Sequence, residues 1–423
     1  MKNPEYFRGK SITVVGLARS GLACANLLHD AGARVSVTDS RNDRSTRANS
    51  GLLRPSGIKV ELGRHTPGFI RGRDLVVISP GVEQTALPVV WAAKEGIGVI
   101  SEVEAAWLLC PAAVIAVTGS SGKTTVTTLI GQVLKAAKKR AFVCGNIGNP
   151  FSGEVKKLKA SDYVVLEISS FQLENIRSFK PRIAVITNVS RNHLDRYPGM
   201  REYIDAKRRI SLNQDSGDYL ILNSLDKESE RIARATAASV RFFQPSAGLN
   251  PNQAAVLKVA EITGISRRTC LGVFKDFKGL EHRMEEAACI KGVKFINDSK
   301  ATTVESAVWA LENTSSPVIL IAGGKDKGGD YRKLLGPARG KVKEVILIGQ
   351  ARKKIGRALR PSLAVSESDT LEEAVDRAFS KAAPGDCVIL SPMCSSFDMF
   401  SDYEHRGRVF KNEVLKLSKC KGK

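Results

Sequence analysis

The chain has 423 residues, and its 65 Lys and Arg against 43 Asp and Glu give a formal net charge of +22. Hydrophobic residues make up 43% and charged residues 26%, which is typical of a folded chain of roughly two to four domains and excludes a mostly disordered protein. Eight cysteines without a C-x-x-C pair exclude a small disulfide scaffold and favour a reducing compartment, so we expect a cytoplasmic protein.

The positive charge does not predict a nucleic-acid-binding protein. Basic residues are spread along the chain without a recognition-helix or RNA-binding motif, and only 6% of residues are aromatic, so stacking platforms are scarce. The sequence also shows no signal-peptide pattern and no apolar run of bilayer length. We therefore expect a monomer that binds small anionic molecules and neither nucleic acid nor a membrane.

Short β-branched runs alternate with helical patterns along the chain. The expected strands are residues 11–16, 35–39, 74–81, 112–119, 163–170, 182–188, 219–223, 295–300, 317–324, 344–349 and 387–392. Strands this apolar are buried on both faces, as in parallel sheets, so the pattern predicts an α/β fold. Nearly every run ends in a polar residue or glycine, where open α/β sheets bind their ligands. Domain boundaries are expected near residues 102–111 and 280–294.

The first strand is followed by GLARSG (16–21), which partly matches a dinucleotide-binding fingerprint. Asp39 lies about 20 residues further on, as in that fingerprint. The central glycine is replaced by Ala18, whose side chain hinders the close approach of a pyrophosphate. NAD is therefore the weaker interpretation, and a nucleoside diphosphate held in another way, with Asp39 and the turn SPG (79–81), stays open.

The strongest motif is TGSSGKTT (118–125), between an expected strand and an expected helix. A glycine-rich turn there lets backbone N–H groups surround a phosphate chain at the positive end of the helix. Lys123 would reach the outer phosphates, and the hydroxyl of Thr124 would face Mg²⁺. The first glycine of the full phosphate-loop pattern is replaced by Val117.

Further polar groups follow neighbouring strands. Glu167 ends a hydrophobic strand, where a carboxylate is costly unless it is paired or bound to metal. His193 lies in NVSRNHLD (188–195), after the next strand. Together with Thr124 these residues predict a Mg²⁺ site. The loops NDSKAT (297–302), GGKDKG (323–328) and SPMCSSFD (391–398) also follow strands, and their number predicts one concave polar site.

These motifs together resemble the Mur ligase family. The shortened phosphate loop TGSSGKTT combines here with LEISSFQLE, NVSRNHLDRYP, GLEHRME, NDSKATT, AGGKDKGGDY and LSPMCSSFDMFSDYEHRG. The resemblance covers nearly the whole chain. It implies a Rossmann-like UDP-binding domain at residues 1–104, a central P-loop ATPase-like domain with a mostly parallel sheet at 105–285, and a C-terminal dinucleotide-fold-like domain for an amino acid at 286–423.

The resemblance is greatest to the members that add D-glutamate to UDP-N-acetylmuramoyl-L-alanine, a step of peptidoglycan precursor synthesis. It implies ATP and Mg²⁺ as cofactors and an acyl-phosphate intermediate. The D-N-P-R signature of members that add a diamino acid is absent. Two alternatives stay open, which are a related ligase with another amino-acid specificity and an NAD-dependent dehydrogenase.

The resemblance also implies roles for individual residues. The expected catalytic residues are Lys123, Glu167, His193 and Lys207, and the expected metal ligands are Thr124, Glu167, His193 and Lys207 as its carbamate. The expected ATP contacts are Gly119, Ser120, Ser121, Gly122, Lys123, Thr124, Thr125, Asn252, Arg283, Asp298 and Lys300. The expected contacts to the UDP-linked substrate are Arg19, Ser20, Asp39, Arg41, Ser79, Gly81, Asn146 and Gln172. The expected D-glutamate contacts are Thr302, Lys327, Ser396, Phe397 and Tyr403.

Overall fold

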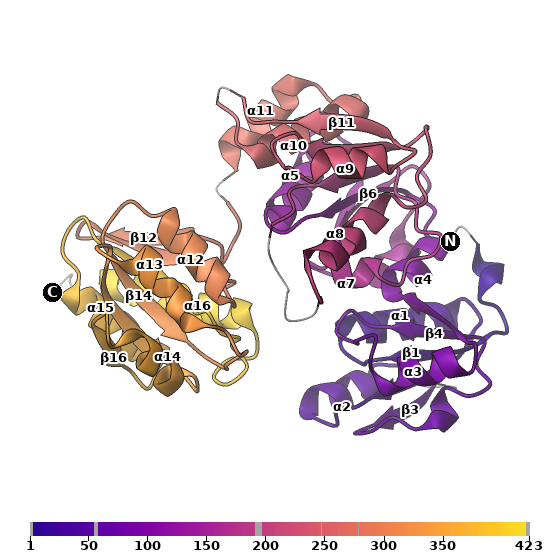
Figure 1. The fold of residues 1–423 in the computed structure, drawn as a ribbon, viewed down its shortest axis with the longest axis horizontal. Helices are drawn as coiled ribbons and strands as arrows, with labels where there is room; N and C mark the ends of the chain where they lie inside the picture. Colours follow the sequence, from indigo (N-terminus) through magenta and orange to yellow (C-terminus); the bar gives the residue numbers. More distant parts are fainter. Residues whose placement is uncertain (1–2, 55–57, 191–196, 247, 278, 420–423) are drawn as a thin grey trace. The chain divides into compact units, whose positions relative to one another are not determined.

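The computed structural model describes residues 3–54, 58–190, 197–246, 248–277 and 279–419, which form three sheets flanked by helices (Figure 1). Residues 1–277 make one compact unit with two of the sheets, and residues 278–423 make a second unit with the third sheet. The expected α/β fold with mostly parallel sheets is confirmed, and all eleven expected strands are present. Among the described helices, none combines the length and the apolar character needed to cross a membrane.

The first sheet is fully parallel, in the order β3-β2-β1-β4-β5. Its strands are β1 (Ser11–Val15), β2 (Arg34–Asp39), β3 (Lys59–Leu62), β4 (Leu75–Ile78) and β5 (Gly98–Ser101). Its helices are α1 (Arg19–Asp30), α2 (Arg44–Gly51), α3 (Leu87–Lys94) and α4 (Glu102–Leu109). The turns after β1, β2 and β4 therefore lie at the same edge of the sheet.

The second sheet is also parallel, in the order β11-β10-β9-β6-β8-β7. Its strands are β6 (Ala113–Thr118), β7 (Ala141–Gly145), β8 (Tyr163–Glu167), β9 (Ile183–Ile186), β10 (Tyr219–Asn223) and β11 (Ser239–Phe243). Its helices are α5 (Lys123–Ala136), α6 (Phe151–Glu154), α7 (Ser170–Leu173), α8 (Met200–Arg208), α9 (Ser229–Arg234), α10 (Pro251–Ile262) and α11 (Arg267–Asp276). The central position of β6 puts the phosphate-loop motif between the ends of β8 and β9.

The third sheet has the order β12-β13-β17-β14-β15-β16, and only β12 runs antiparallel to its neighbour. Its strands are β12 (Glu285–Ile290), β13 (Val293–Asn297), β14 (Val318–Gly323), β15 (Val342–Ile348), β16 (Val365–Glu367) and β17 (Cys387–Leu390). Its helices are α12 (Val304–Glu312), α13 (Leu335–Ala338), α14 (Arg352–Leu359), α15 (Leu371–Lys381) and α16 (Tyr403–Lys419). The polar loops after β13, β14 and β17 meet at one edge, because these strands are neighbours.

Helix α4 joins the first two sheets into one unit. Its apolar residues belong to a single core that extends from β1 and β2 to β6 and β8. Glu104 on this helix is 1% exposed. Its carboxylate accepts hydrogen bonds from the backbone N–H groups of Arg177, Ser178 and Phe179 at 3.0, 2.7 and 2.9 Å, and from the Ser178 hydroxyl. The buried side chain of Glu104 is thus held by the turn after α7.

Replacing Glu104 by glutamine should destabilise the unit of residues 1–277 by about 2–4 kcal/mol, because an amide nitrogen would then face backbone donors that need an acceptor. The measurement is urea unfolding followed by circular dichroism. The control is Glu95→Gln, since Glu95 is exposed and forms an ion pair with Arg71 at the surface. A loss no larger than that of the control would contradict the role given to Glu104.

Candidate active site

The loop between β6 and α5 has the backbone that a phosphate-binding turn requires. Gly119 and Gly122 have φ values of +148° and +77°, a region that side chains strongly disfavour. A Cβ at Gly119 would lie 1.9 Å from the Thr187 hydroxyl, and one at Gly122 would lie 2.5 Å from Oδ1 of Asn252. Both glycines are therefore needed, and Asn252, a residue of the expected ATP set, lies directly against the loop.

The segment after β9 fixes the loop from the other side. The N–H groups of Ser120 and Ser121 donate to the carbonyl and the side-chain oxygen of Asn188, each at 2.9 Å. The Thr187 hydroxyl donates to the carbonyl of Ser121 at 2.6 Å. The loop is thus preorganised by protein contacts. The last loop residues, Thr124 and Thr125, lie in the first turn of α5, and Thr124 is buried.

Two lysines converge on one carbonyl of this loop. Nζ of Lys123 lies 2.9 Å and Nζ of Lys207 lies 2.8 Å from the oxygen of Gly119. Lys207, on α8, is 2% exposed and lies over the Tyr203 ring at 4.5 Å. Within the described residues, no carboxylate forms an ion pair with it. Burial, and then repulsion from Lys123, hold the pKa of Lys207 well below its ordinary value, which favours a neutral amine.

Glu167 is a buried carboxylate at the end of β8, the strand that pairs with β6 beside the phosphate loop. It is 2% exposed, and its Oε1 accepts a hydrogen bond from Nδ2 of Asn146 at 2.8 Å. Its Oε2 is buried and has no hydrogen-bond partner among the residues that the structure describes. An orphaned carboxylate oxygen calls for a cation, and oxygen donors such as Glu167 and the Thr124 hydroxyl suit Mg²⁺. His193, the third expected ligand, lies outside the described residues.

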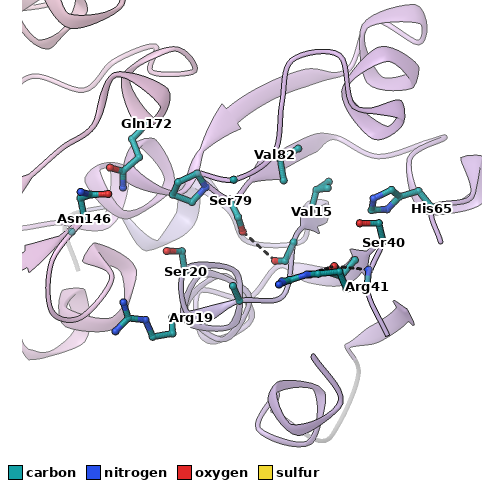
Figure 2. A pocket seen from close by; sticks show the side chains of 16 residues that line it. Val15, Arg19, Ser20, Ser40, Arg41, His65, Ser79, Val82, Asn146 and Gln172 are labelled. Carbon is teal, nitrogen blue, oxygen red and sulfur yellow. Dashed lines mark hydrogen bonds and ion pairs between the residues drawn. The ribbon is translucent and has the colours of Figure 1, made fainter. Parts of the chain in front are cut away.

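A cavity of about 640 Å³ lies between the first two sheets. The structure brings together around it all eight residues expected to contact the UDP-linked substrate (Figure 2): Arg19, Ser20, Asp39, Arg41, Ser79, Gly81, Asn146 and Gln172. The cavity is within the size range of small-molecule sites. It reaches Asn146, and through the bond from Asn146 to Glu167 it adjoins the candidate metal site.

Local hydrogen bonds orient the polar groups of this cavity. The side-chain oxygen of Gln172 accepts from the N–H of Ser169 at 3.0 Å in a capping box at the start of α7, which leaves its amide nitrogen to the cavity. The carboxylate of Asp39 accepts from the N–H groups of Leu17 and Arg41 at 2.7 and 2.8 Å and from the Arg41 guanidinium. Although burial opposes it, these bonds hold the pKa of Asp39 below its ordinary value.

In the second unit, the three polar loops expected to form one site do lie together. The N–H of Met393 donates to the carbonyl of Ala301 at 2.9 Å, and Lys325 forms an isolated bridge with Ser395. The expected ATP-side and amino-acid residues of this unit are carried by these loops and the segments beside them: Arg283, Asp298, Lys300, Thr302, Lys327, Ser396, Phe397 and Tyr403. Nζ of Lys300 lies over the Tyr403 ring at 5.3 Å. Ser396 is buried, whereas Phe397 is 69% exposed.

Two residues that no sequence motif predicts also belong to these sites. His65 lines the 640 Å³ cavity, after the short strand β3. Arg406, on α16, is fully buried, and it donates to Oγ and the carbonyl oxygen of Ser299 at 3.0 and 2.9 Å and to the carbonyl oxygen of Cys394 at 3.3 Å. It thus joins two of the polar loops. No spacing pattern marks either residue.

A group of Glu281, His282 and Glu285 is arranged closely enough to hold a metal ion. The ammonium group of Lys411 already lies there, at 2.6 Å from Glu281 and 2.9 Å from Glu285. Part of the negative charge of this group is therefore compensated by the protein itself. The group does not enter the candidate site.

Asp298 gives a pH-dependent stability. It is 6% exposed and accepts from the Ser391 hydroxyl at 2.9 Å, and burial raises its pKa from 3.8 to about 6. Since the folded-state pKa is the higher one, the wild-type unit should lose stability as the pH rises from 4 through 6, by up to about 3 kcal/mol. Asp298→Asn, which cannot ionise, should escape this loss.

The measurement is urea unfolding of the wild type and of Asp298→Asn at pH 4 and pH 7. The stability of the variant relative to the wild type should increase toward pH 7. The control is Asp369→Asn, because Asp369 is exposed in its surface pair with Arg352. A difference between wild type and Asp298→Asn that does not change with pH would contradict the raised pKa.

Three family models match the chain. They are described as the Mur ligase MurD-like N-terminal domain, the Mur ligase middle domain and the Mur ligase glutamate ligase domain, and they match residues 10–101, 117–277 and 282–394. A UDP-N-acetylmuramoylalanine–D-glutamate ligase from Koribacter versatilis is 40% identical over 446 residues, covering 97% of this chain and 98% of the relative. One from Geotalea uraniireducens is 40% identical over 448 residues, covering 98% and 99%.

Solved structures share the fold. The UDP-N-acetylmuramate-alanine ligase of Thermotoga maritima superposes with a TM-score of 0.61 at 18% identity, covering 96% of this chain and all of that one. A pseudomurein peptide ligase of Methanothermus fervidus gives a TM-score of 0.57, also at 18% identity, covering 97% of this chain and all of that one. At this level of identity the likeness concerns the fold alone.

Proposed function

This chain belongs to the Mur ligase family, and we propose that it is an ATP-dependent ligase that joins D-glutamate to UDP-N-acetylmuramoyl-L-alanine. The near full-length identity of 40% to ligases named for this reaction supports the assignment. The structural observation that carries it is the bond between Asn146 and Glu167, because it connects a cavity of suitable size for a UDP-linked substrate to the neighbourhood of the phosphate loop.

The loop of residues 118–125 is the proposed ATP phosphate site. Backbone N–H groups at the start of α5 and the ammonium of Lys123 compensate the charge of the β- and γ-phosphates. Asn252 lies against Gly122, which supports the proposal that its side chain contacts the nucleotide. Glu167 and Thr124 are the proposed ligands of Mg²⁺, with His193 added from the family pattern. When bound, Mg²⁺ supplies charge neutralisation at the phosphate oxygens.

The proposed reaction has two steps. The alanyl carboxylate of the UDP-linked substrate attacks the γ-phosphorus of ATP, which forms an acyl phosphate and releases ADP. The amine of D-glutamate then attacks the acyl carbon, the tetrahedral intermediate collapses with loss of phosphate, and the surplus proton goes to solvent. The protein contributes mainly by positioning the reactants and by compensating their charge.

Lys207 has the environment in which a lysine forms a carbamate. Among the described residues its buried amine has no carboxylate partner, and it shares the carbonyl oxygen of Gly119 with Lys123. We propose that the neutral amine adds CO₂ to form an N–C bond and releases a proton. The product is an anion, which relieves the repulsion between the two lysines and can act as a further metal ligand.

The second unit carries the proposed amino-acid site. Lys327 would pair with a carboxylate of D-glutamate, while Thr302, Ser396, Phe397 and Tyr403 would form the rest of its pocket. Arg283, Asp298 and Lys300 are the proposed ATP-side residues of the same unit. The proposed use of ATP favours a cytoplasmic location. The seven cysteines of the described chain are all free of disulfides, which also favours this location.

The test of the amino-acid assignment is a competition. Purified protein with ATP, Mg²⁺ and UDP-N-acetylmuramoyl-L-alanine is given an equimolar mixture of D-glutamate, L-lysine and meso-diaminopimelate, and the products are identified by mass spectrometry. We expect a product heavier by one glutamyl group. A product that carries a diamino acid would assign the chain to the related ligases instead.

A further inference from the structure

His65 lies at the end of the 640 Å³ cavity that is opposite Asn146. In Figure 2, Asn146 and Gln172 are on one side of the cavity, whereas His65, Ser40 and Arg41 are on the other. The side of Asn146 adjoins Glu167 and therefore the reacting carboxylate. The nucleobase is the part of the UDP-linked substrate most distant from that carboxylate, so His65 lies where the base is expected.

A buried network fixes the imidazole ring. Nδ1 of His65 lies 2.8 Å from the hydroxyl of Thr38, which is fully buried in β2. The same hydroxyl lies 3.1 Å from the carboxylate of Glu61 and 3.3 Å from the carbonyl of Arg64. The carboxylate of Glu61 is in turn held by the N–H and hydroxyl of Thr66 at 2.9 and 2.7 Å. The ring therefore has a defined orientation.

The network also determines which ring nitrogen carries the proton. The carboxylate and the carbonyl can only accept hydrogen bonds, so the single proton of the Thr38 hydroxyl goes to one of them, and the bond to a carboxylate is the stronger. The hydroxyl then accepts from Nδ1–H of His65. Burial lowers the pKa of His65, which keeps the ring neutral. Nε2 is left as an acceptor, and no described residue forms a hydrogen bond with it.

Asp39, the acidic residue that lines the cavity, is not available to accept a hydrogen bond from the base. Both carboxylate oxygens of Asp39 already accept two bonds each, from the N–H of Leu17, the N–H of Arg41 and the Arg41 guanidinium. Asp39 thus holds the turn and Arg41 in place. Nε2 of His65 is left as a neutral acceptor for an N–H group of the base.

We propose that His65 reads the base of the UDP-linked substrate, by accepting a hydrogen bond from N3–H of uracil at Nε2. The inference rests on the proposed function, whose cavity it refines. Cytosine presents an acceptor at N3, so its lone pair would face that of Nε2. His65 is therefore a residue that makes the cavity specific for uracil, since a site built to bond an N–H rejects a ligand that lacks it.

The test is calorimetric titration of the full chain with UDP, 3-methyl-UDP and 2′-deoxy-UDP. The wild type should bind UDP at least tenfold more tightly than 3-methyl-UDP, which has no N3–H. His65→Ala, whose smaller side chain leaves room for the methyl group, should bind the two within about threefold of each other. The matched control is His29→Ala, at the far end of α1 and about 15 Å along its axis from the cavity. It should keep the wild-type ratio.

The outcomes separate this inference from the proposed function. A wild type that binds no UDP overturns both. A wild type that binds UDP and 3-methyl-UDP equally, or a His65→Ala variant that keeps the wild-type ratio, overturns the role of His65 alone. If His65→Ala instead loses its discrimination against 2′-deoxy-UDP, the histidine contacts the ribose, and the base assignment is wrong. Should His65→Ala not fold, Thr38→Val, which removes the acceptor of Nδ1–H, must reduce the ratio.

Discussion

Lys123→Ala should lower kcat by about 10³-fold or more while the protein stays folded. The ammonium of Lys123 lies 2.9 Å from the carbonyl oxygen of Gly119 and 3.2 Å from that of Ser120, at the opening of the phosphate loop. In the proposed ATP complex it exchanges these acceptors for phosphate oxygens. Its loss removes the side-chain cation that compensates the charge on the transferred phosphoryl group.

The measurement is ADP formation at saturating substrates, with thermal unfolding as the test of folding. Lys135→Ala is the matched control, because Lys135 is exposed in the last turn of the same helix. The control should keep wild-type turnover. Near-normal turnover of Lys123→Ala would contradict the assignment of this loop to ATP.

Lys207→Ala should lose about 10²–10³-fold in kcat and should regain part of it when a short carboxylate is added. In the wild type the buried amine is the proposed site of the carbamate. Alanine leaves a space over Tyr203 beside the loop, where acetate or formate can place a carboxylate. Lys207→Arg is the matched variant, because its guanidinium fills this space and cannot form a carbamate.

The measurement is turnover of both variants as a function of acetate concentration. We expect partial restoration for Lys207→Ala and none for Lys207→Arg. Full activity of Lys207→Ala would remove Lys207 from the mechanism. A loss that no carboxylate restores would contradict the carbamate and leave Lys207 as a structural residue.

The strands that the sequence predicts are the interior ones. All eleven expected strands have a neighbouring strand on both sides, and most of their side chains are buried on both faces, so most of their residues are apolar. The six strands without a prediction are β3, β5, β7, β11, β12 and β16, and each is the edge strand of its sheet. Edge strands are partly exposed, and most of them are short or carry charged residues, so a long apolar run does not mark them in the sequence.

The same difference between interior and edge strands decides which residues of the site could be predicted. Motifs that follow interior strands could be located from the sequence, and the eight residues expected around the UDP-linked substrate do line one cavity. His65 follows β3, an edge strand, and its importance depends on a tertiary contact with Thr38. Arg406 is in the first turn of a helix, 107 residues from the serine that it contacts. Contacts between residues that are far apart in the chain leave no local pattern in the sequence.

The short segment between β10 and α10 shows what the structure adds. In the structure, the capping box of α10 between Asn250 and Gln253 fixes the start of the helix, and Oδ1 of Asn252 lies against Gly122. We therefore propose that Asn252 contacts ATP.

The most direct test of the proposed reaction is phosphate release from ATP and Mg²⁺ in the presence of UDP-N-acetylmuramoyl-L-alanine. D-glutamate, L-glutamate and no amino acid are compared in parallel. We expect stoichiometric release with D-glutamate and little release in the other two reactions. Equal release in all three, or none from folded protein with D-glutamate, would contradict it.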